Sequence, residues 1–391
     1  IGTISLVLLI GMLIPIAIGM PLGFASGFLA VVVMVLKFGP DLLFGNFGTG
    51  PLNILGTRIY GIMTSYVLVS VPLFIFMANL LERSNIASDM YSTLERWMNK
   101  TRGGIAVVTA LMAIVMAAMS GIIGGEVVLL GLIALPQMLR LGYDKNLAIG
   151  IICASGSLGT MIPPSIVLIF YGLITETSIH AMFQAAFVPG FILAGCYIAY
   201  ILIRTNLQPH LAPLPEPSET DLTGRQKRVF GMALITMIIG AAAAIMFARA
   251  VFFNTVGTPE FGTEKISQSF MIWSAIVAIA LGAFLYFGIG TKQTKAAWEN
   301  GKGMVAPLLI VFVVLGSIYG GITGITEAAG IGSFAVLLLI IVRGEFTWAL
   351  LHEATMRTFK STGTIIWVTI GATALAGAYT ISVSYTHLTL P

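Results

Sequence analysis

Hydrophobic residues gather along the chain into long runs that are separated by short polar stretches. A helix that crosses a bilayer needs about 20 mostly apolar residues. Runs near or above this length lie at about residues 2–36, 60–81, 105–139, 147–174, 186–203, 229–248, 270–289, 304–342 and 363–383. The pattern therefore predicts an all-α polytopic fold, in which most helices span a membrane.

Three of these runs, 2–36, 105–139 and 304–342, are too long for one crossing and too short for two ordinary crossings. Glycine, proline or serine interrupts each of them. Such breaks survive at membrane depth only where protein or a water-filled cavity supplies hydrogen bonds to the backbone. We expect broken helices and re-entrant hairpins, with 105–139 forming a hairpin that returns to its own side and the other two runs crossing twice.

Composition narrows the class of protein. Of the 391 residues, 57% are hydrophobic and only 9% are charged, whereas soluble globular chains carry about 25% charged residues. This disfavours a soluble enzyme, a disordered chain and a nucleic-acid-binding protein. The two cysteines and the four histidines show no metal-ligand spacing. We expect no organic cofactor.

Basic residues are unequally divided between the two faces that these crossings define. One face holds 16 of the 20 Lys and Arg residues, in loops near 82–104, 140–146, 204–228, 290–303 and 343–362. Loops on the cytoplasmic side carry an excess of such residues. We therefore expect this basic face to be cytoplasmic.

Polar stretches divide the chain further. Residues 204–228 contain four prolines and are interpreted as an extended cytoplasmic linker. Additional spans are expected within 229–289. Segments 84–102 and 345–360 are amphipathic and are interpreted as helices on the cytoplasmic surface, with ordinary solvated loops as the alternative.

An internal repeat is also visible. A shift of 305 residues aligns three glycine pairs, Gly11 with Gly316, Gly19 with Gly324, and Gly27 with Gly332. Inverted repeats with broken helices are typical of secondary transporters. We expect 1–203 to form a first repeat half and 290–383 part of a second half. The chain is thus expected to be truncated at its C-terminus, with a doubtful tail at 384–391.

Several motifs identify a family that the chain resembles. They are VPLFIFMANLLERSNIASDMYSTLERWMNKTRGG (71–104), MSGIIGGEVVLLGLIALPQM (119–138), ASGSLGTMIPPSIVLIFYGLITETSI (154–179), FVPG (187–190) and GGITGITEAAGIGS (320–333). Over nearly all of residues 5–382 the chain resembles the large permease subunit of tripartite ATP-independent periplasmic (TRAP) transporters. It departs from the family at Ile122–Gly125, where members often have a Ser-rich hairpin tip, and at Ile325, where they often have proline.

The resemblance implies a sodium-coupled importer of organic acids in the bacterial inner membrane. It implies a scaffold and a transport part that moves like an elevator. It also implies two protein partners, a small membrane subunit and a periplasmic substrate-binding protein. A stand-alone ion-coupled carboxylate transporter is the nearest alternative. A membrane hydrolase and a passive channel are less favoured, because no hydrolase motif occurs and broken-helix repeats indicate alternating access.

The helix breaks indicate where ions and substrate bind. Unwound helices offer carbonyl and hydroxyl oxygens to sodium, and consecutive prolines free carbonyls in the preceding turn. We expect one sodium site to lie between the hairpin tip and the first broken helix, formed by Ser120, Gly121, Ser155, Gly156, Ser157 and Thr160. The substrate carboxylate is expected beside it, near Pro163, Pro164 and Ser165, at the positive end of a half-helix. The alternative is that these small residues only allow close helix packing.

Four further polar residues lie at or beside the breaks. Glu126 lies inside a hairpin limb, where a carboxylate is expected to be functional; it could ligate a cation, carry a proton or cap the helix. Thr326 is expected to cap a helix that starts at Glu327, whose carboxylate favours the positive end of that helix. A role of Thr323, Thr326 and Glu327 in coupling or gating is the alternative.

Overall fold

The computed structural model describes residues 2–39, 51–98, 101–121, 123–214, 224–256, 268–283, 287 and 291–387. Within these ranges all regular structure is helical and no strand occurs. In the described part of the chain, six helices are long and apolar enough to cross a membrane, and shorter apolar helices accompany them. The prediction of an all-α polytopic membrane protein is confirmed.

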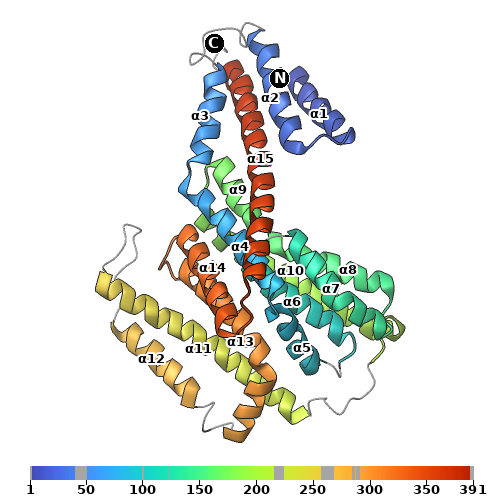
Figure 1. Ribbon diagram of the computed structural model, residues 1–391, viewed down its shortest axis with the longest axis vertical. Coiled ribbons are helices and arrows are strands. Elements are labelled where there is room, and N and C mark those ends of the chain that lie inside the picture. Colours follow the sequence, from blue (N-terminus) through green and yellow to red (C-terminus); the bar gives the residue numbers. More distant parts are fainter. Residues whose placement is uncertain are drawn as a thin grey trace. The chain divides into compact units, whose positions relative to one another are not determined.

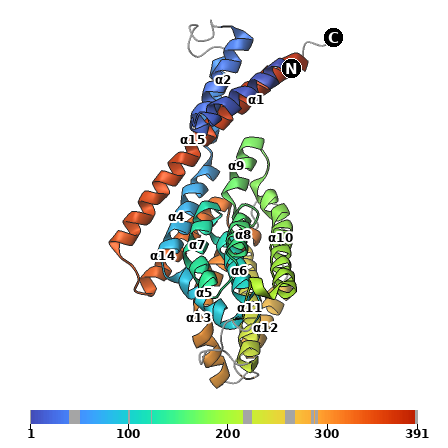
Figure 2. The same cartoon turned by 90° about the vertical axis from the view of Figure 1, so that its right-hand side faces the viewer.

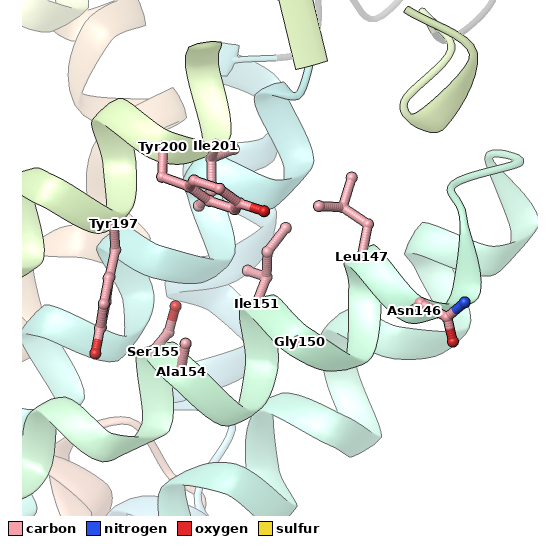
Figure 3. Close-up of a pocket in the computed structure, with 9 residues that line it drawn as sticks. All are labelled: Asn146, Leu147, Gly150, Ile151, Ala154, Ser155, Tyr197, Tyr200 and Ile201. Carbon is pink, nitrogen blue, oxygen red and sulfur yellow. The ribbon is translucent and has the colours of Figure 1, made fainter. Parts of the chain in front are cut away.

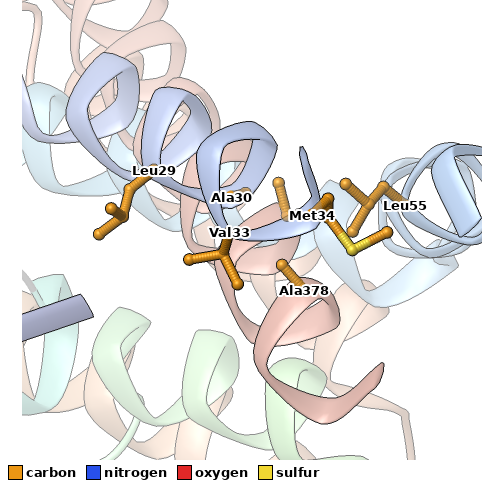
Figure 4. Close-up of a cluster of buried hydrophobic side chains, with 7 residues drawn as sticks. Leu29, Ala30, Val33, Met34, Leu55 and Ala378 are labelled. Carbon is orange, nitrogen blue, oxygen red and sulfur yellow. The ribbon is translucent and has the colours of Figure 1, made fainter. Parts of the chain in front are cut away.

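The chain forms two compact units. The first contains Ile1–Pro72, Phe170–Thr177 and Met356–Pro391. Its elements are α1 (Gly2–Ala17), α2 (Leu22–Phe38), α3 (Pro51–Met63), η2 (Tyr66–Val69) and most of α15 (Trp348–His387) (Figure 1). A small apolar cluster joins these helices, made by Leu29, Ala30, Val33 and Met34 of α2, Leu55 of α3, and Ala374 and Ala378 of α15 (Figure 4).

Helices α2 and α15 touch through two glycines. A Cβ atom at Gly23 would lie 2.7 Å from Trp367 Cδ1 and 2.8 Å from the Trp367 carbonyl oxygen. A Cβ atom at Gly371 would in turn overlap the carbonyl oxygen of Gly23. The Trp367 ring packs on Phe24, with 4.8 Å between ring centroids. The two helix backbones are therefore in direct contact, which only small residues permit.

The second unit contains Leu73–Ile169 and Ser178–Thr355. Figure 2 shows its helices α4 to α8 and α10 close together. Its elements are α4 (Ser70–Arg83), α5 (Ile86–Met98), α6 (Gly104–Ser120), α7 (Ile123–Arg140), α8 (Lys145–Gly156), η3 (Ser157–Thr160), the start of α9 (Ile166–Thr175), α10 (Ile179–Leu207), η4 (Pro209–Leu211), α11 (Gly224–Val256), α12 (Gln268–Ala283), α13 (Thr291–Tyr319) and α14 (Ile325–Val342). This spatial grouping does not test the predicted division into repeat halves, which stays a prediction.

The three over-long runs are broken where the sequence predicts. The first divides into α1 and α2 after Gly19, the hairpin run into α6 and α7 after Gly121, and the third into α13 and α14 after Gly321. These glycines have φ angles of 88°, 61° and 66°. A side chain strains this left-handed backbone, so glycine is the residue that allows the chain to leave a helix in this way.

Two boundaries differ from the sequence predictions. The expected surface helix at 345–360 is not separate, because α15 runs without a break from Trp348 to His387 and no proline interrupts it. The expected linker 204–228 is shorter, because α10 continues to Leu207 and α11 begins at Gly224. Residues 215–223 of this linker and residues 388–391 of the expected tail lie outside the described residues.

The Gly371 contact yields a test of the first unit. We expect Gly371→Ala to destabilise the protein by about 1–3 kcal/mol, because the new methyl group overlaps the α2 backbone. Gly363→Ala is the matched control on the same helix, since nothing lies within 4 Å of a Cβ atom there, and alanine favours a helix by about 0.5–1 kcal/mol. Thermal unfolding in detergent measures both. Equal unfolding temperatures of the two variants would show that the close contact is wrong.

Candidate functional site

The hairpin tip exposes both backbone and side-chain oxygens. Ser120 ends α6, and Gly121 turns the chain with its left-handed backbone. The Ser120 hydroxyl lies 3.0 Å from the Met116 carbonyl oxygen and also donates to the Glu126 carboxylate. Glu126 lies in the first turn of α7, where the positive end of the helix favours a negative charge. The two limbs of the hairpin are thus joined across their own tip.

The helix that the sequence breaks at two prolines is interrupted over a longer stretch. Helix α8 ends at Gly156, a 3-10 turn follows, and α9 begins only at Ile166. Hydroxyl groups satisfy the carbonyls that the break frees. Ser157 Oγ donates to the Ala154 carbonyl at 2.7 Å, Thr160 Oγ1 to the Ser157 carbonyl at 2.7 Å, and Ser165 Oγ to the Thr160 carbonyl at 2.9 Å. Each hydroxyl oxygen keeps lone pairs with which it can bind a cation.

The hairpin tip lies directly on this broken helix. The Ile166 backbone N–H donates to the Gly121 carbonyl at 3.3 Å. A Cβ atom at Gly121 would overlap the Pro164 carbonyl oxygen and lie 3.2 Å from Ser165 Cα. The structure therefore brings Gly121 of the hairpin tip against Pro164 and Ser165. The sodium site and the substrate site expected from the sequence stay predictions.

Glu126 is the buried acidic residue of this contact. The residue is only 1% exposed. Its Oε1 atom accepts the Ser120 hydroxyl, whereas its buried Oε2 atom has no hydrogen-bond partner. The carboxylate lies against the broken helix, because a Cβ atom at Gly159 would be 2.9 Å from Oε2 and 3.0 Å from Oε1. A carboxyl oxygen that lacks a hydrogen-bond partner is costly in such a place.

Glu82 is a neighbour that the sequence analysis does not identify. A Cβ atom at Gly125 would overlap Glu82 Oε1 and lie 3.0 Å from Glu82 Cδ. Glu82 is near the end of α4, so in the sequence it reads as part of a polar flank after an apolar run. Its position close to Glu126 adds negative charge to the hairpin tip, which favours a cation there.

Ser155 and Gly156 face other neighbours. Ser155 lines a cavity of about 260 Å³ between α8 and α10, and Figure 3 shows it near Tyr197 and Ile151. The Ser155 hydroxyl is buried and has no hydrogen-bond partner. A Cβ atom at Gly156 would meet Val127 Cγ2 of α7, so this glycine serves close helix packing. Ser155 thus offers its hydroxyl to the cavity, whereas Gly159 is the residue that meets Glu126.

The second break forms its own group on α13 and α14. The cap predicted for Thr326 is wrong, because α14 begins at Ile325 and its N-cap residue is Gly324. Glu327 lies in the first turn, and its Oε2 atom would lie 2.5 Å from a Cβ atom at Gly324. The carboxylate therefore reaches back over the start of its own helix, where the helix dipole favours it. The Thr323 hydroxyl is buried without a hydrogen-bond partner.

Oxygen atoms of a carboxylate, of hydroxyl groups and of the backbone surround Glu126, Ser120 and the broken helix. Among the described residues no group of three or more His, Cys, Asp or Glu side chains could hold a metal ion. Sodium instead accepts carbonyl and hydroxyl oxygens, which a broken helix supplies.

Comparisons with known proteins agree with this architecture. Residues 6–389 match the family described as tripartite ATP-independent periplasmic transporter, DctM component. The chain is 29% identical to the C4-dicarboxylate TRAP transporter large permease protein of Pseudomonas aeruginosa, over 73% of this chain and 60% of that protein. It is 30% identical to the ectoine/5-hydroxyectoine large permease of Ruegeria pomeroyi, over 63% of this chain and 62% of that protein. It is 25% identical to the sialic acid large permease of Vibrio cholerae, over 69% and 64%.

The contact of the hairpin tip with the broken helix can be tested at Gly121. We expect Gly121→Ala to destabilise the protein by about 2–4 kcal/mol, because the methyl group strains a left-handed backbone and overlaps Pro164. Gly124→Ala is the matched control, since nothing lies within 4 Å of a Cβ atom there. Hydrogen exchange should show faster exchange of the Ile166 amide in Gly121→Ala alone. Unchanged exchange at this amide would contradict the contact.

Proposed function

The chain belongs to the DctM component family of tripartite ATP-independent periplasmic transporters, and we propose that it acts in sodium-coupled uptake of a small organic anion. The family consists of transport permeases, so the chain is a membrane transport protein and not an enzyme. Its apolar helices and its family agree with a multi-pass protein of the bacterial inner membrane. The chain spans about 60% of the length of the first two curated relatives, so the activity and partners of the whole protein belong to this proposal.

The proposed assembly has three components. The chain acts as the large permease subunit, beside a small membrane subunit and a periplasmic protein that delivers the substrate. The family itself supports this, because its members are parts of tripartite transporters. The relatives are named for C4-dicarboxylate, ectoine and sialic acid transport, so the family description alone leaves the substrate of this chain open.

The unpaired Glu126 carboxylate oxygen carries the proposal of cation coupling. A buried carboxylate inside a membrane protein needs either a counter-charge or a proton, and we propose the counter-charge here. Glu126 contacts the Ser120 hydroxyl and the Gly159 backbone. The Glu82 carboxylate lies against Gly125, the residue before Glu126. None of these three is positive. A sodium ion would supply the charge and take its remaining ligands from hydroxyl and carbonyl oxygens of the broken helix, including those of Ser157 and Thr160.

A place for an organic anion lies at the other end of the same break. Helix α9 begins at Ile166, whose N–H donates to the Gly121 carbonyl, and the N–H groups that follow it in the first turn have no partner within the helix. The positive end of this half-helix favours a carboxylate. Ser165 lies at that point, with its hydroxyl oxygen free to accept a hydrogen bond. We place the substrate beside Ser165 and the sodium ion beside Glu126, so that a single contact between hairpin and broken helix serves both.

Sodium dependence is tested with Glu126→Gln. We expect the sodium concentration for half-maximal uptake to rise about tenfold or more, because the neutral amide no longer offsets the charge of the ion. Uptake is measured in vesicles that contain the complete permease, the small subunit and the loaded binding protein. Glu176→Gln, at an exposed carboxylate after α9, is the control and should leave the sodium dependence unchanged.

Two outcomes would contradict this proposal. Undiminished uptake with potassium in place of sodium would show that sodium is not the coupling ion. An unchanged dependence of uptake on sodium concentration in Glu126→Gln would show that this carboxylate does not bind the ion.

A further inference from the structure

A second polar site lies apart from the hairpin, where α5 meets α13 and the turn after α14. It is a pocket of about 440 Å³. A Cβ atom at Gly303 of α13 would lie 2.5 Å from Thr93 Oγ1 and 2.7 Å from the Asp89 carbonyl carbon of α5. The two helices are therefore in backbone contact along one side of the pocket, and its shape is fixed by close packing.

An ion network fixes another side of the pocket. Arg343 donates to Asp89, and its Nε atom donates to Glu345 at 2.9 Å. Glu345 also accepts the backbone N–H of Asn85, at 3.1 Å. The Arg343 guanidinium is thus committed to two carboxylates within the protein. Charge-assisted bonds of this kind hold side chains in one geometry.

Three charged side chains outside this network also line the pocket. Arg96 of α5 and Lys302 of α13 are exposed and positive, and Glu299, one turn before Lys302, is exposed and negative. The Ser92 hydroxyl lies on the same wall. With the network included, three basic and three acidic groups line the pocket, so its formal charge is zero. Positive and negative side chains outside the network can each bind a group of opposite charge. Such a surface matches a zwitterion better than an anion.

The pocket lies where apolar helix segments end. The apolar segment of α13 runs from Gly301 to Tyr319 and has Lys302 as its second residue, and that of α14 ends at Val342, directly before Arg343. By length and hydropathy, the apolar segments of α13 and α14 thus end at the level of the pocket. Lipid headgroups occupy the level at which such segments end in a bilayer. Lys and Arg side chains at helix ends reach lipid phosphates in this position.

We propose that this pocket binds the headgroup of a zwitterionic phospholipid, with Arg96 and Lys302 holding the phosphodiester and Glu299 the primary ammonium group. A phosphoethanolamine headgroup has both groups close together, and its ammonium donates hydrogen bonds that the carboxylate accepts. The lipid would join α5 to α13 at the membrane surface. This inference does not depend on the sodium site, because the pocket shares no residue with it.

Native mass spectrometry of the full permease tests the proposal. The purified protein is stripped of lipid and then titrated with phosphatidylethanolamine or with phosphatidylglycerol of the same acyl chains. We expect one phosphatidylethanolamine to bind preferentially, and the double variant Arg96→Gln/Lys302→Gln to weaken this binding about tenfold or more. Lys145→Gln/Arg204→Gln is the matched control, because it removes the same charge from exposed sites outside the pocket. It should bind the lipid as the wild type does.

Glu299→Gln tests the proposed contact with the ammonium group separately from the contacts with the phosphodiester. We expect it to abolish the preference for phosphatidylethanolamine over phosphatidylglycerol, while the folded protein keeps its unfolding temperature because the side chain is exposed. Unchanged lipid binding in the double variant would overturn the proposal. Equal binding of the two lipids to the wild type would overturn the zwitterion match. Glycerophosphoethanolamine has the same headgroup but lacks acyl chains. If it competes equally strongly, the ligand is a soluble phosphodiester and the proposal of a bound lipid is wrong.

Discussion

The contact between the hairpin tip and the broken helix is the constraint on which the candidate site depends. A helix broken within a membrane must find partners for the backbone groups that it frees. Here the partners come from two sources. Hydroxyl groups of Ser157, Thr160 and Ser165 satisfy carbonyls within the break, and the Gly121 carbonyl satisfies the first N–H of α9. The break is stable because a second break, the turn of the hairpin, lies against it.

At this contact a buried carboxylate oxygen has no hydrogen-bond partner, and the Ser155 hydroxyl at the end of α8 also lacks one. The Glu126 Oε2 atom lies between the hairpin and the broken helix. Two arginines near helix ends are different, because Arg83 pairs with Glu353 and Arg343 with Asp89 and Glu345. These ion pairs join neighbouring elements of the fold. The Glu126 carboxylate in the hairpin accepts one hydroxyl, from Ser120, and its second oxygen is buried without a partner.

Much of the fold follows from the sequence because its breaks are local. Gly19, Gly121 and Gly321 end helices through their own backbone conformation, so their positions predict the turns. Local signals also misled. Thr326 has the side chain of a helix cap, but the helix starts before it at Ile325. The amphipathic pattern of 345–360 indicates a separate surface helix, but nothing in the sequence ends that helix before the next apolar run.

The candidate site follows from the sequence only in part, because its contacts join residues that are distant along the chain. The sequence indicates that Ser120 and Ser165 lie at breaks, and the structure brings those breaks together. It does not indicate that Ser155 lines a cavity beside Tyr197, or that Glu82 approaches the hairpin. Those facts depend on the rotation of α8 and the end of α4, which helix periodicity does not determine to a single side chain.

The approach of Glu126 to Gly159 has a consequence for sequence variation. With no side chain at position 159, the space beside the broken helix is filled by the long acidic side chain from position 126. A larger residue at 159 would displace the Glu126 carboxylate from this position. The side chains at positions 126 and 159 therefore share one space, although they lie on different elements. A change at one of them determines which residues are tolerated at the other.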